Sequence, residues 1–214
     1  MSLFTLDDPR PNAAEAPYTY FLPLPDHLAA LQRDDSVKLV FRPTASGTKW
    51  DAERMWVTVT RVDGDHLEGV LDNHPDDIPG LEAGASVSFF LWHVIAIQFD
   101  PEHQATPQPD PRREYWERCM VDKAVIQGEL KVDYIYREAP DLAGADDNYP
   151  DSGWRIRGDL LNATDAEIDA RETAYIAIGA ILNRDSSWLH LIDEPVGTAF
   201  RRNFDDDTYA PENR

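Results

Sequence analysis

The chain contains one cysteine among its 214 residues, so no disulfide can form within it. That cysteine content is typical of proteins from a reducing compartment. No apolar run is long enough to cross a membrane as a helix, because the longest runs have the length of a strand. The first residues also lack the basic and apolar regions of a signal peptide. We therefore predict a cytoplasmic protein that makes no membrane contact.

Basic residues are scarce, with 20 lysines and arginines against 40 aspartates and glutamates and a formal net charge of −20. The acidic excess runs through both halves of the chain. A field of this sign repels nucleic acid, which is therefore not predicted as a partner. It attracts a basic protein and accelerates the encounter. Solubility or adaptation to high salt explains the same charge equally well, and the sequence leaves these explanations open.

The motifs of common enzymes and metal sites are absent. The six histidines are scattered, and neither a His-x-x-x-His nor a Cys-x-x-Cys pair occurs. Neither a phosphate-binding glycine loop nor a Gly-x-Ser-x-Gly elbow is present. Ser152 and Cys119 have no catalytic signature around them, which favours a turn serine and a buried thiol. We predict no catalytic residue, no metal and no cofactor.

Alternating apolar residues between turn residues predict a β-rich domain over residues 18–99. The turn Asp63-Gly64-Asp65 predicts a hairpin. Antiparallel strands joined by short turns imply a small barrel or curled sheet. Residues 1–17 are polar and proline-rich and are expected to form a flexible arm. The predicted strands span residues 18–22, 37–42, 55–62, 66–71 and 86–99, with a helical turn at 25–31.

Four prolines among polar residues mark residues 100–113 as a linker between two domains. Residues 114–204 then predict an α+β domain with a mostly antiparallel sheet. Within it, Thr164 and Glu167 have the spacing of a capping box at a helix start. Residues 205–214 are expected to form a frayed acidic tail. The predicted fold class is therefore α+β, with two small domains.

A group of tryptophan, arginine and acidic residues after the acidic loop 138–151 is the candidate binding site. Tryptophan and arginine are the residues that most often carry interface energy. Gly153 is expected to supply flexibility, and Arg155 and Arg157 to share one strand face. For Trp154 the favoured interpretation is a core residue whose indole N–H binds a loop carbonyl. The candidate partner-binding residues are Asp151, Ser152, Gly153, Trp154, Arg155, Arg157 and Arg201.

Short segments of both halves carry a likeness to known families. The specific pieces of the second half are Asp151-Ser152-Gly153-Trp154 and Pro195-Val196-Gly197-Thr198-Ala199-Phe200, and the likeness of the first half includes Gly69-Val70-Leu71-Asp72-Asn73 and Ile78-Pro79-Gly80-Leu81. On these pieces the second half resembles family thirty-three of the immunity proteins of bacterial polymorphic toxin systems (domain of unknown function 2185), and the first half is similar to domain of unknown function 2314. At Gly158-Asp159-Leu160-Leu161 the chain departs from the acidic stretch that immunity family members often carry.

The resemblance implies a non-enzymatic bacterial protein that neutralises a toxin by stoichiometric binding, and the charge of the chain favours a basic toxin. The family is not defined by a catalytic residue, so the resemblance supplies none. One alternative is an enzyme or small-ligand sensor with a site between the two domains. A structural adaptor that docks through the strand edges of the barrel is another. The enzyme or sensor site would use Trp154, Ser152, Asp151 and either His93 or Cys119.

Overall fold

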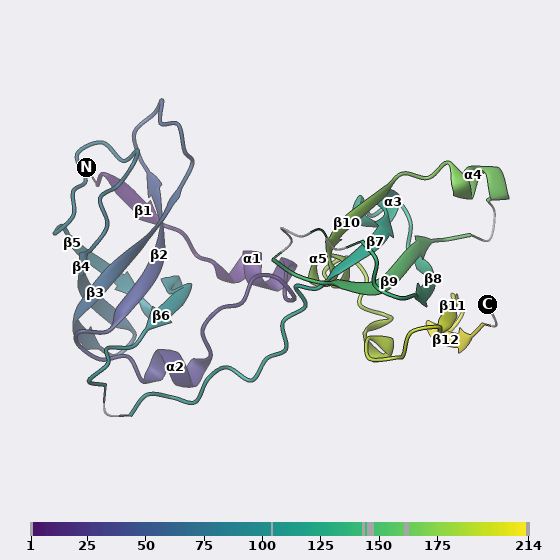
Figure 1. The fold of residues 1–214 in the computed structure, drawn as a ribbon. Coiled ribbons are helices and arrows are strands. Elements are labelled where there is room, and N and C mark those ends of the chain that lie inside the picture. Colours follow the sequence, from purple (N-terminus) through teal and green to yellow (C-terminus); the bar gives the residue numbers. More distant parts are fainter. Residues whose placement is uncertain (1, 104, 143, 145–147, 161–162, 213–214) are drawn as a thin grey trace. The chain divides into compact units, whose positions relative to one another are not determined.

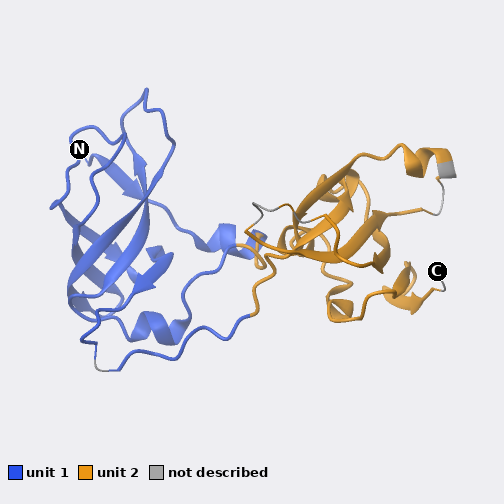
Figure 2. Ribbon diagram, viewed as in Figure 1, with its two compact units in different colours: residues 1–15, 20–112 blue, residues 16–19, 113–214 orange. Residues whose placement is uncertain are grey.

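The computed structural model describes residues 2–103, 105–142, 144, 148–160 and 163–212. The chain forms two compact units (Figure 1). Each unit has its own hydrophobic core. Unit 1 comprises residues 1–15 and 20–112, and unit 2 comprises residues 16–19 and 113–214 (Figure 2). The predicted α+β class with two small domains is confirmed. Among the described residues, no helix is long and apolar enough to span a membrane.

Unit 1 is a curled antiparallel sheet whose main path runs β1-β2-β3-β4-β5. Strand β2 pairs with β3 along one edge, and with β1 and β6 at different points of the other edge. The sheet therefore nearly closes on itself, which confirms the predicted small barrel or curled sheet. Its strands are β1 (Phe4–Leu6), β2 (Ser36–Pro43), β3 (Glu53–Asp63), β4 (His66–Leu71), β5 (Ser86–Phe90) and β6 (Ala96–Gln98).

The core of unit 1 follows from strict alternation along its strands. In β2, Val37, Leu39 and Phe41 are fully buried, while the residues between them point outward. The predicted hairpin between β3 and β4 is present, with Gly64 at a φ of +61°. The run expected as one strand over residues 86–99 is instead divided by the 3-10 turn η1 (Leu91–His93), which turns the chain so that β6 reaches β2.

The N-terminal segment and the last residues, expected as a flexible arm and a frayed tail, form paired strands in the structure. Strand β1 pairs with β2, and the helix α1 (Arg10–Glu15) follows it. Strand β12 (Thr208–Pro211) likewise pairs with β11 (Ala199–Asn203). In both cases an open strand edge offers backbone hydrogen bonds that a nearby polar segment can take up.

Two further predictions for unit 1 also differ from the structure. The linker expected at residues 100–113 begins with ordered chain, because the buried ring of His103 places Nε2 3.0 Å from the carbonyl oxygen of Ala30. Residues 18–22 form no strand, whereas the expected helical turn is present as α2 (Pro25–Ala29).

Unit 2 contains a six-stranded sheet of order β10-β7-β9-β8-β11-β12. All its pairings are antiparallel except that of β7 with β9. The capping box at Thr164 and Glu167 is confirmed at the start of α4. The remaining elements are β7 (Arg118–Asp122), β8 (Val132–Arg137), β9 (Asp151–Gly158), β10 (Thr173–Ala177), α3 (Lys123–Ile126), α4 (Asp165–Asp169), α5 (Ile178–Leu182) and the 3-10 turn η2 (Leu189–Leu191).

One face of the unit 2 sheet forms the core of that unit. Trp154 and Ile156 of β9 lie there, packed in one cluster with Val125 of α3, Ile178 of α5 and Trp188. All five side chains are at most 1% exposed. Helices α3 and α5 therefore cover this face, and the side chains at the intervening positions of each strand point to the opposite side.

Candidate functional site on the outer face of unit 2

The sheet face of unit 2 that points away from its core carries tyrosine, arginine and methionine side chains in two cross-strand rows. The strand register aligns the members of each row from strand to strand. Neighbours in such rows lie close enough for their side chains to interact. We call this surface the outer face. Its first row is Tyr175, Met120, Arg155 and Tyr136, and its second row is Asp122, Arg157, Tyr134 and Arg201.

Aromatic and cationic groups stack along the β8 side of the outer face. The ring centroids of Tyr134 and Tyr136 are 5.5 Å apart, and the Arg201 guanidinium carbon lies 5.1 Å from the centroid of the Tyr134 ring. Met120 and Tyr175 continue the surface, and all four uncharged side chains are half-buried. Tyrosine, arginine and methionine are enriched in protein interfaces. The composition of this face therefore resembles that of protein interfaces.

Arg155 occupies the middle of the first row and is saturated with carboxylate partners. Its guanidinium donates two hydrogen bonds of 3.0 Å to the two oxygens of Asp151. It also binds Glu138 at 2.8 Å and Asp141 at 3.0 Å. The Arg155 side chain is only 5% exposed, so these partners compensate a buried charge. Arg155 thus holds residues 138–141 against strand β9.

The charge state of Asp151 follows from the same contacts. Burial acts to raise the pKa of Asp151, but hydrogen bonds from Arg155 and from the backbone N–H groups of Gly153, Leu142 and Asp141 outweigh it and lower the pKa to about 2. The hydrogen bonds from Asp151 and Glu138 in turn raise the pKa of Arg155. Both groups are therefore charged at neutral pH.

Asp122 plays the equivalent part in the second row. Its fully buried carboxylate lies 2.9 Å from Nε of Arg157 and accepts a hydrogen bond of 3.2 Å from Arg171. It also accepts the backbone N–H of Gly158 at 2.9 Å. The other end of the Arg157 guanidinium donates to the carbonyl oxygen of Ile168 at 2.8 Å. The position of Arg157 is therefore fixed by α4 and β7 together.

Arg201 ends the second row beside another buried acid. Its guanidinium lies 3.3 Å from Asp133 and 3.0 Å from Glu212, and its side chain remains 36% exposed. Burial raises the pKa of Asp133, despite hydrogen bonds to this carboxylate from the Leu160 N–H and attraction by Arg201. Of the arginines in the two rows, Arg201 is the most accessible to a partner.

The seven residues proposed from the sequence separate into two groups. Asp151, Ser152, Gly153, Trp154 and Arg155 are buried and cannot touch a partner in this structure, whereas Arg157 and Arg201 are partly exposed on the outer face. The indole N–H of Trp154 donates to the carbonyl oxygen of Ile192 at 3.2 Å, as expected for a core residue. Arg155 and Arg157 do share one face of β9, as the alternation predicts.

Gly153 is expected from the sequence to supply flexibility, and in the structure it also meets a conformational requirement that only glycine satisfies. Strand β9 has four residue steps from Asp151 to Arg155 where β7 has two, so the chain bulges between them. Gly153 has a φ of +81°, and a Cβ there would lie 2.1 Å from the carbonyl oxygen of Glu138. Only glycine fits this position, because both the dihedral angle and the close approach exclude a side chain.

Met120, Tyr134, Tyr136 and Tyr175 were not identified from the sequence. The alternation over residues 131–137 did carry a signal, because Tyr134 and Tyr136 share the parity opposite to the buried Ile135. Which strands lie beside β8, and therefore which residues join the two tyrosines, depends on the strand order. That order is set by contacts between residues far apart in the sequence.

The residues considered for catalysis are placed in structural roles. Cys119 is fully buried, and burial raises the pKa of its thiol to about 12. The Ser152 hydroxyl donates to the carbonyl oxygen of Arg118 at 2.7 Å, and the buried His93 accepts the Phe90 N–H at 2.9 Å. Within the described ranges, no group of three or more His, Cys, Asp or Glu side chains is arranged to hold a metal ion.

Comparison with known proteins places each unit in a family. Residues 24–95 match the family described as an uncharacterized protein conserved in bacteria, DUF2314. Residues 119–211 match the immunity protein Imm33 domain, and this range includes every residue of the outer face. No curated protein and no solved structure matches the chain. Unit 2 therefore carries a domain of the immunity protein Imm33 family, and unit 1 carries a domain of the DUF2314 family.

Proposed function

We propose that this chain is a non-enzymatic immunity protein that neutralises a basic bacterial toxin in the cytoplasm by stoichiometric binding through the outer face. The observation that carries the proposal is the match of residues 119–211 to an immunity protein domain. Within that range, the outer face is the surface whose tyrosine, methionine and arginine content resembles that of protein interfaces.

The dimensions of the outer face suit a protein partner. Its first row runs from β10 through β7 and β9 to β8. Neighbouring strands are about 4.8 Å apart, so the row is roughly 15 Å wide before side chains at its rim are counted. The two rows are smaller than the roughly 800 Å² that each partner usually contributes to a specific interface, and residues 138–141 cover Arg155, so a protein partner would contact the exposed parts of the rows together with their rim.

The contacts within the outer face favour binding over chemistry. Arg155 and Arg157 are held by carboxylates, so the face is rigid before a partner arrives. Tyr134 and Tyr136 have few rotatable bonds and lose little entropy on binding. Because the local charges of the rows are largely paired, the contact itself is aromatic and apolar. The long-range field of the chain, with its net charge of −20, then selects a basic partner.

The first experiment identifies the partner by its toxicity and by rescue. The tagged full-length chain is used to capture proteins from its native host, and each captured protein is expressed alone and together with this chain. We expect one captured basic protein that arrests growth alone, is tolerated with this chain, and forms a 1:1 complex by light scattering. If no captured protein is toxic, or if co-expression does not relieve the toxicity, the proposed function is wrong.

The second experiment locates the contact. Tyr134→Ala and Arg201→Ala remove side chains at the exposed end of the outer face and should each weaken toxin binding by at least about tenfold. Arg184→Ala is the matched control, because Arg184 is exposed in the same unit beyond α5, on the core side of the sheet. Melting curves of the three variants separate lost contact from lost fold. Unchanged affinity of both outer-face variants would move the contact elsewhere on the domain.

A further inference from the structure

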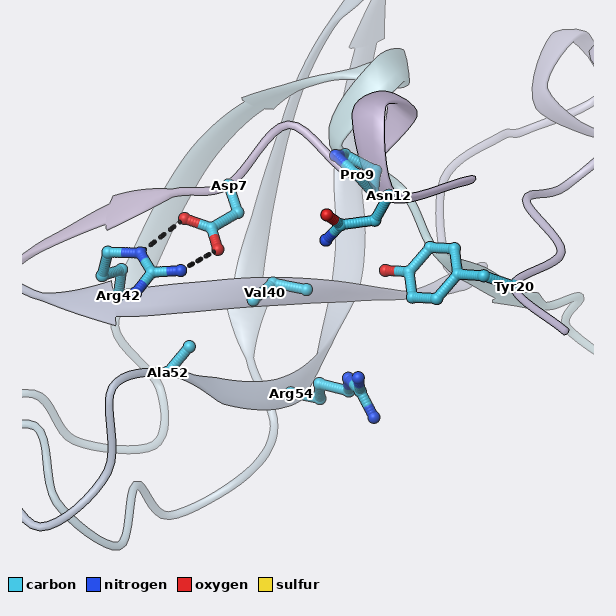
Figure 3. Close-up of a pocket in the computed structure, with 8 residues that line it drawn as sticks. All are labelled: Asp7, Pro9, Asn12, Tyr20, Val40, Arg42, Ala52 and Arg54. Atoms are coloured by element: carbon cyan, nitrogen blue, oxygen red, sulfur yellow. Dashed lines mark hydrogen bonds and ion pairs between the residues drawn. The ribbon is translucent and has the colours of Figure 1, made fainter. Parts of the chain in front are cut away.

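Unit 1 contains a pocket of about 450 Å³ on the outward side of strands β2 and β3. The N-terminal segment and Tyr20 form its upper wall, while outward residues of the two strands form its floor (Figure 3). The volume is in the range of small-molecule sites. The lining residues are Asp7, Pro9, Asn12, Tyr20, Val40, Arg42, Ala52 and Arg54.

One end of the pocket is closed by an ion pair. Arg42 of β2 donates two hydrogen bonds, of 2.9 and 2.6 Å, to the carboxylate of Asp7, as the dashed lines in Figure 3 show. A third hydrogen bond of 3.2 Å joins Arg42 to the carbonyl oxygen of Asp51. This pair neutralises both charges and fastens the N-terminal segment over the sheet. Asp7 is thereby occupied, and it does not repel an anion from the remainder of the pocket.

The other end of the pocket holds polar groups that are still available. In the part of the chain that the structure describes, the side chains of Arg54, Asn12 and Tyr20 make no hydrogen bond or ion pair. In Figure 3 the side chains of Asn12 and Tyr20 point in the same direction over strand β2, and Arg54 is drawn on the neighbouring strand. The guanidinium, the amide and the hydroxyl are all hydrogen-bond donors.

The local charge at this pocket is opposite to that of the whole chain. Arg54 is directly opposite Val40 in the β2–β3 register, and Lys38 is the next outward residue of β2. The Lys38 ammonium lies 4.5 Å from the centroid of the Trp56 ring. Two cations without an acidic partner among the described residues therefore neighbour one another on a chain of net charge −20. Such a concentration of positive charge is what an anion site requires.

We infer that this pocket binds a small organic anion, in which a carboxylate or phosphate group is attached to a compact apolar body. The planar guanidinium of Arg54 suits both anionic groups, which it can engage with two parallel hydrogen bonds. The Tyr20 hydroxyl and the Asn12 amide are further hydrogen-bond donors that line the same pocket. Val40 and Ala52 form the apolar floor against which the body of the ligand packs.

This site is separate from the proposed toxin contact, because it lies wholly in unit 1. Its floor belongs to the range that matches the DUF2314 family, residues 24–95. Its upper wall, from Asp7 to Tyr20, precedes that range. The chain therefore adds its own N-terminal segment to a family-matched sheet to complete the pocket, and either proposal can fail without the other.

The test titrates the full-length chain with four probes and follows backbone amide NMR shifts at constant ionic strength. Acetate and inorganic phosphate present the charged groups alone, while benzoate and phenyl phosphate add an apolar body. We expect saturable shifts at Val40, Ala52 and Arg54, with at least one aromatic probe binding about tenfold more tightly than its small counterpart. Preference between benzoate and phenyl phosphate then assigns the natural ligand as a carboxylate or a phosphate.

Two charge-matched variants decide whether the pocket is responsible. Arg54→Gln should weaken binding of the better aromatic probe by at least about tenfold. Arg61→Gln, which changes an exposed arginine of the same strand paired with Asp63, should leave it unchanged. Both variants alter the net charge equally, so a non-specific charge effect would affect them alike. Equal loss in both variants, or no saturable binding of any probe, would overturn the inference.

Discussion

Arg155 and Asp151 lie four residues apart on strand β9 and meet through two parallel hydrogen bonds, each 3.0 Å long. Residues four apart on a regular strand are roughly 13 Å from one another, which is too far for their side chains to pair in this way. The two side chains meet because the chain bulges at Gly153 between them. The same carboxylate accepts the backbone N–H groups of Asp141 and Leu142, both at 3.2 Å. A single buried acid thus joins β9, its arginine and the loop that covers them.

Asp151→Asn should destabilise unit 2 by about 3–5 kcal/mol at neutral pH, the usual cost of breaking a buried ion pair. The pKa of Asp151 falls from 3.8 to about 2 on folding. The stabilisation is therefore complete above about pH 4 and is lost as the pH falls towards 2. Urea denaturation of the wild type should show this decline, and the variant should show a flatter pH dependence over the same interval.

Asp193→Asn is the control for this prediction. Asp193 forms an equally short ion pair with Arg113, but its side chain is 76% exposed. Exposed pairs contribute about 0–1 kcal/mol, so this variant should remain close to wild-type stability. If the two substitutions destabilise the protein equally, burial is not the reason for the importance of Asp151.

Gly153→Ala tests whether the bulge in β9 requires a glycine at this position. An alanine must adopt a positive φ, which costs about 1–2 kcal/mol, and its Cβ must displace the carbonyl group of Glu138. We expect a total loss of roughly 3 kcal/mol or more in the free energy of unfolding. Gly128→Ala separates the two effects, because Gly128 has a φ of +76° but open space around its Cβ position. Gly128→Ala should therefore lower the free energy of unfolding only by the about 1–2 kcal/mol that the positive φ costs.

The Asp-Ser-Gly-Trp segment shows how far the sequence alone leads. Its composition marked it as important, and the core position of Trp154 followed from the size and polarity of an indole. The burial of Asp151 and Arg155 was not predictable, because it depends on residues 138–142 folding back over β9. The sequence therefore identified the residues that support the site together with the partly exposed Arg157 and Arg201, whereas Met120 and the three tyrosines of the outer face emerged from the strand order.

Strand positions were predicted more successfully than strand partners. The alternation in β2, β3 and β8 records which side of each strand is buried, and this is a local property. The pairing of β1 with β2, and of β12 with β11, leaves no comparable pattern in short polar segments such as Thr208–Pro211. Strands β1 and β12 are held in place by backbone pairing with the edges of β2 and β11.

The Cys119 thiol should be unreactive in the folded protein. It is fully buried, and its pKa of about 12 leaves almost no thiolate at neutral pH. Ellman's reagent should therefore react slowly under native conditions and rapidly with one thiol per chain in concentrated urea. Fast native labelling would show that the core around β7 opens readily, and it would return Cys119 to consideration as a functional group.

Long-range attraction should appear in the kinetics of toxin binding, a prediction that rests on the proposed function. Salt screens charges that are more than about 10 Å apart at 0.1 M, whereas short contacts in the interface are less affected. Raising the salt from about 0.05 to 0.5 M should slow association by roughly tenfold or more and change dissociation little. Surface plasmon resonance at several salt concentrations measures both rates.

Because the excess of 20 negative charges is spread over the chain, neutralising one exposed acid such as Asp193 should slow association only slightly. An association rate independent of salt would mean that the acidity of the chain serves solubility rather than the toxin.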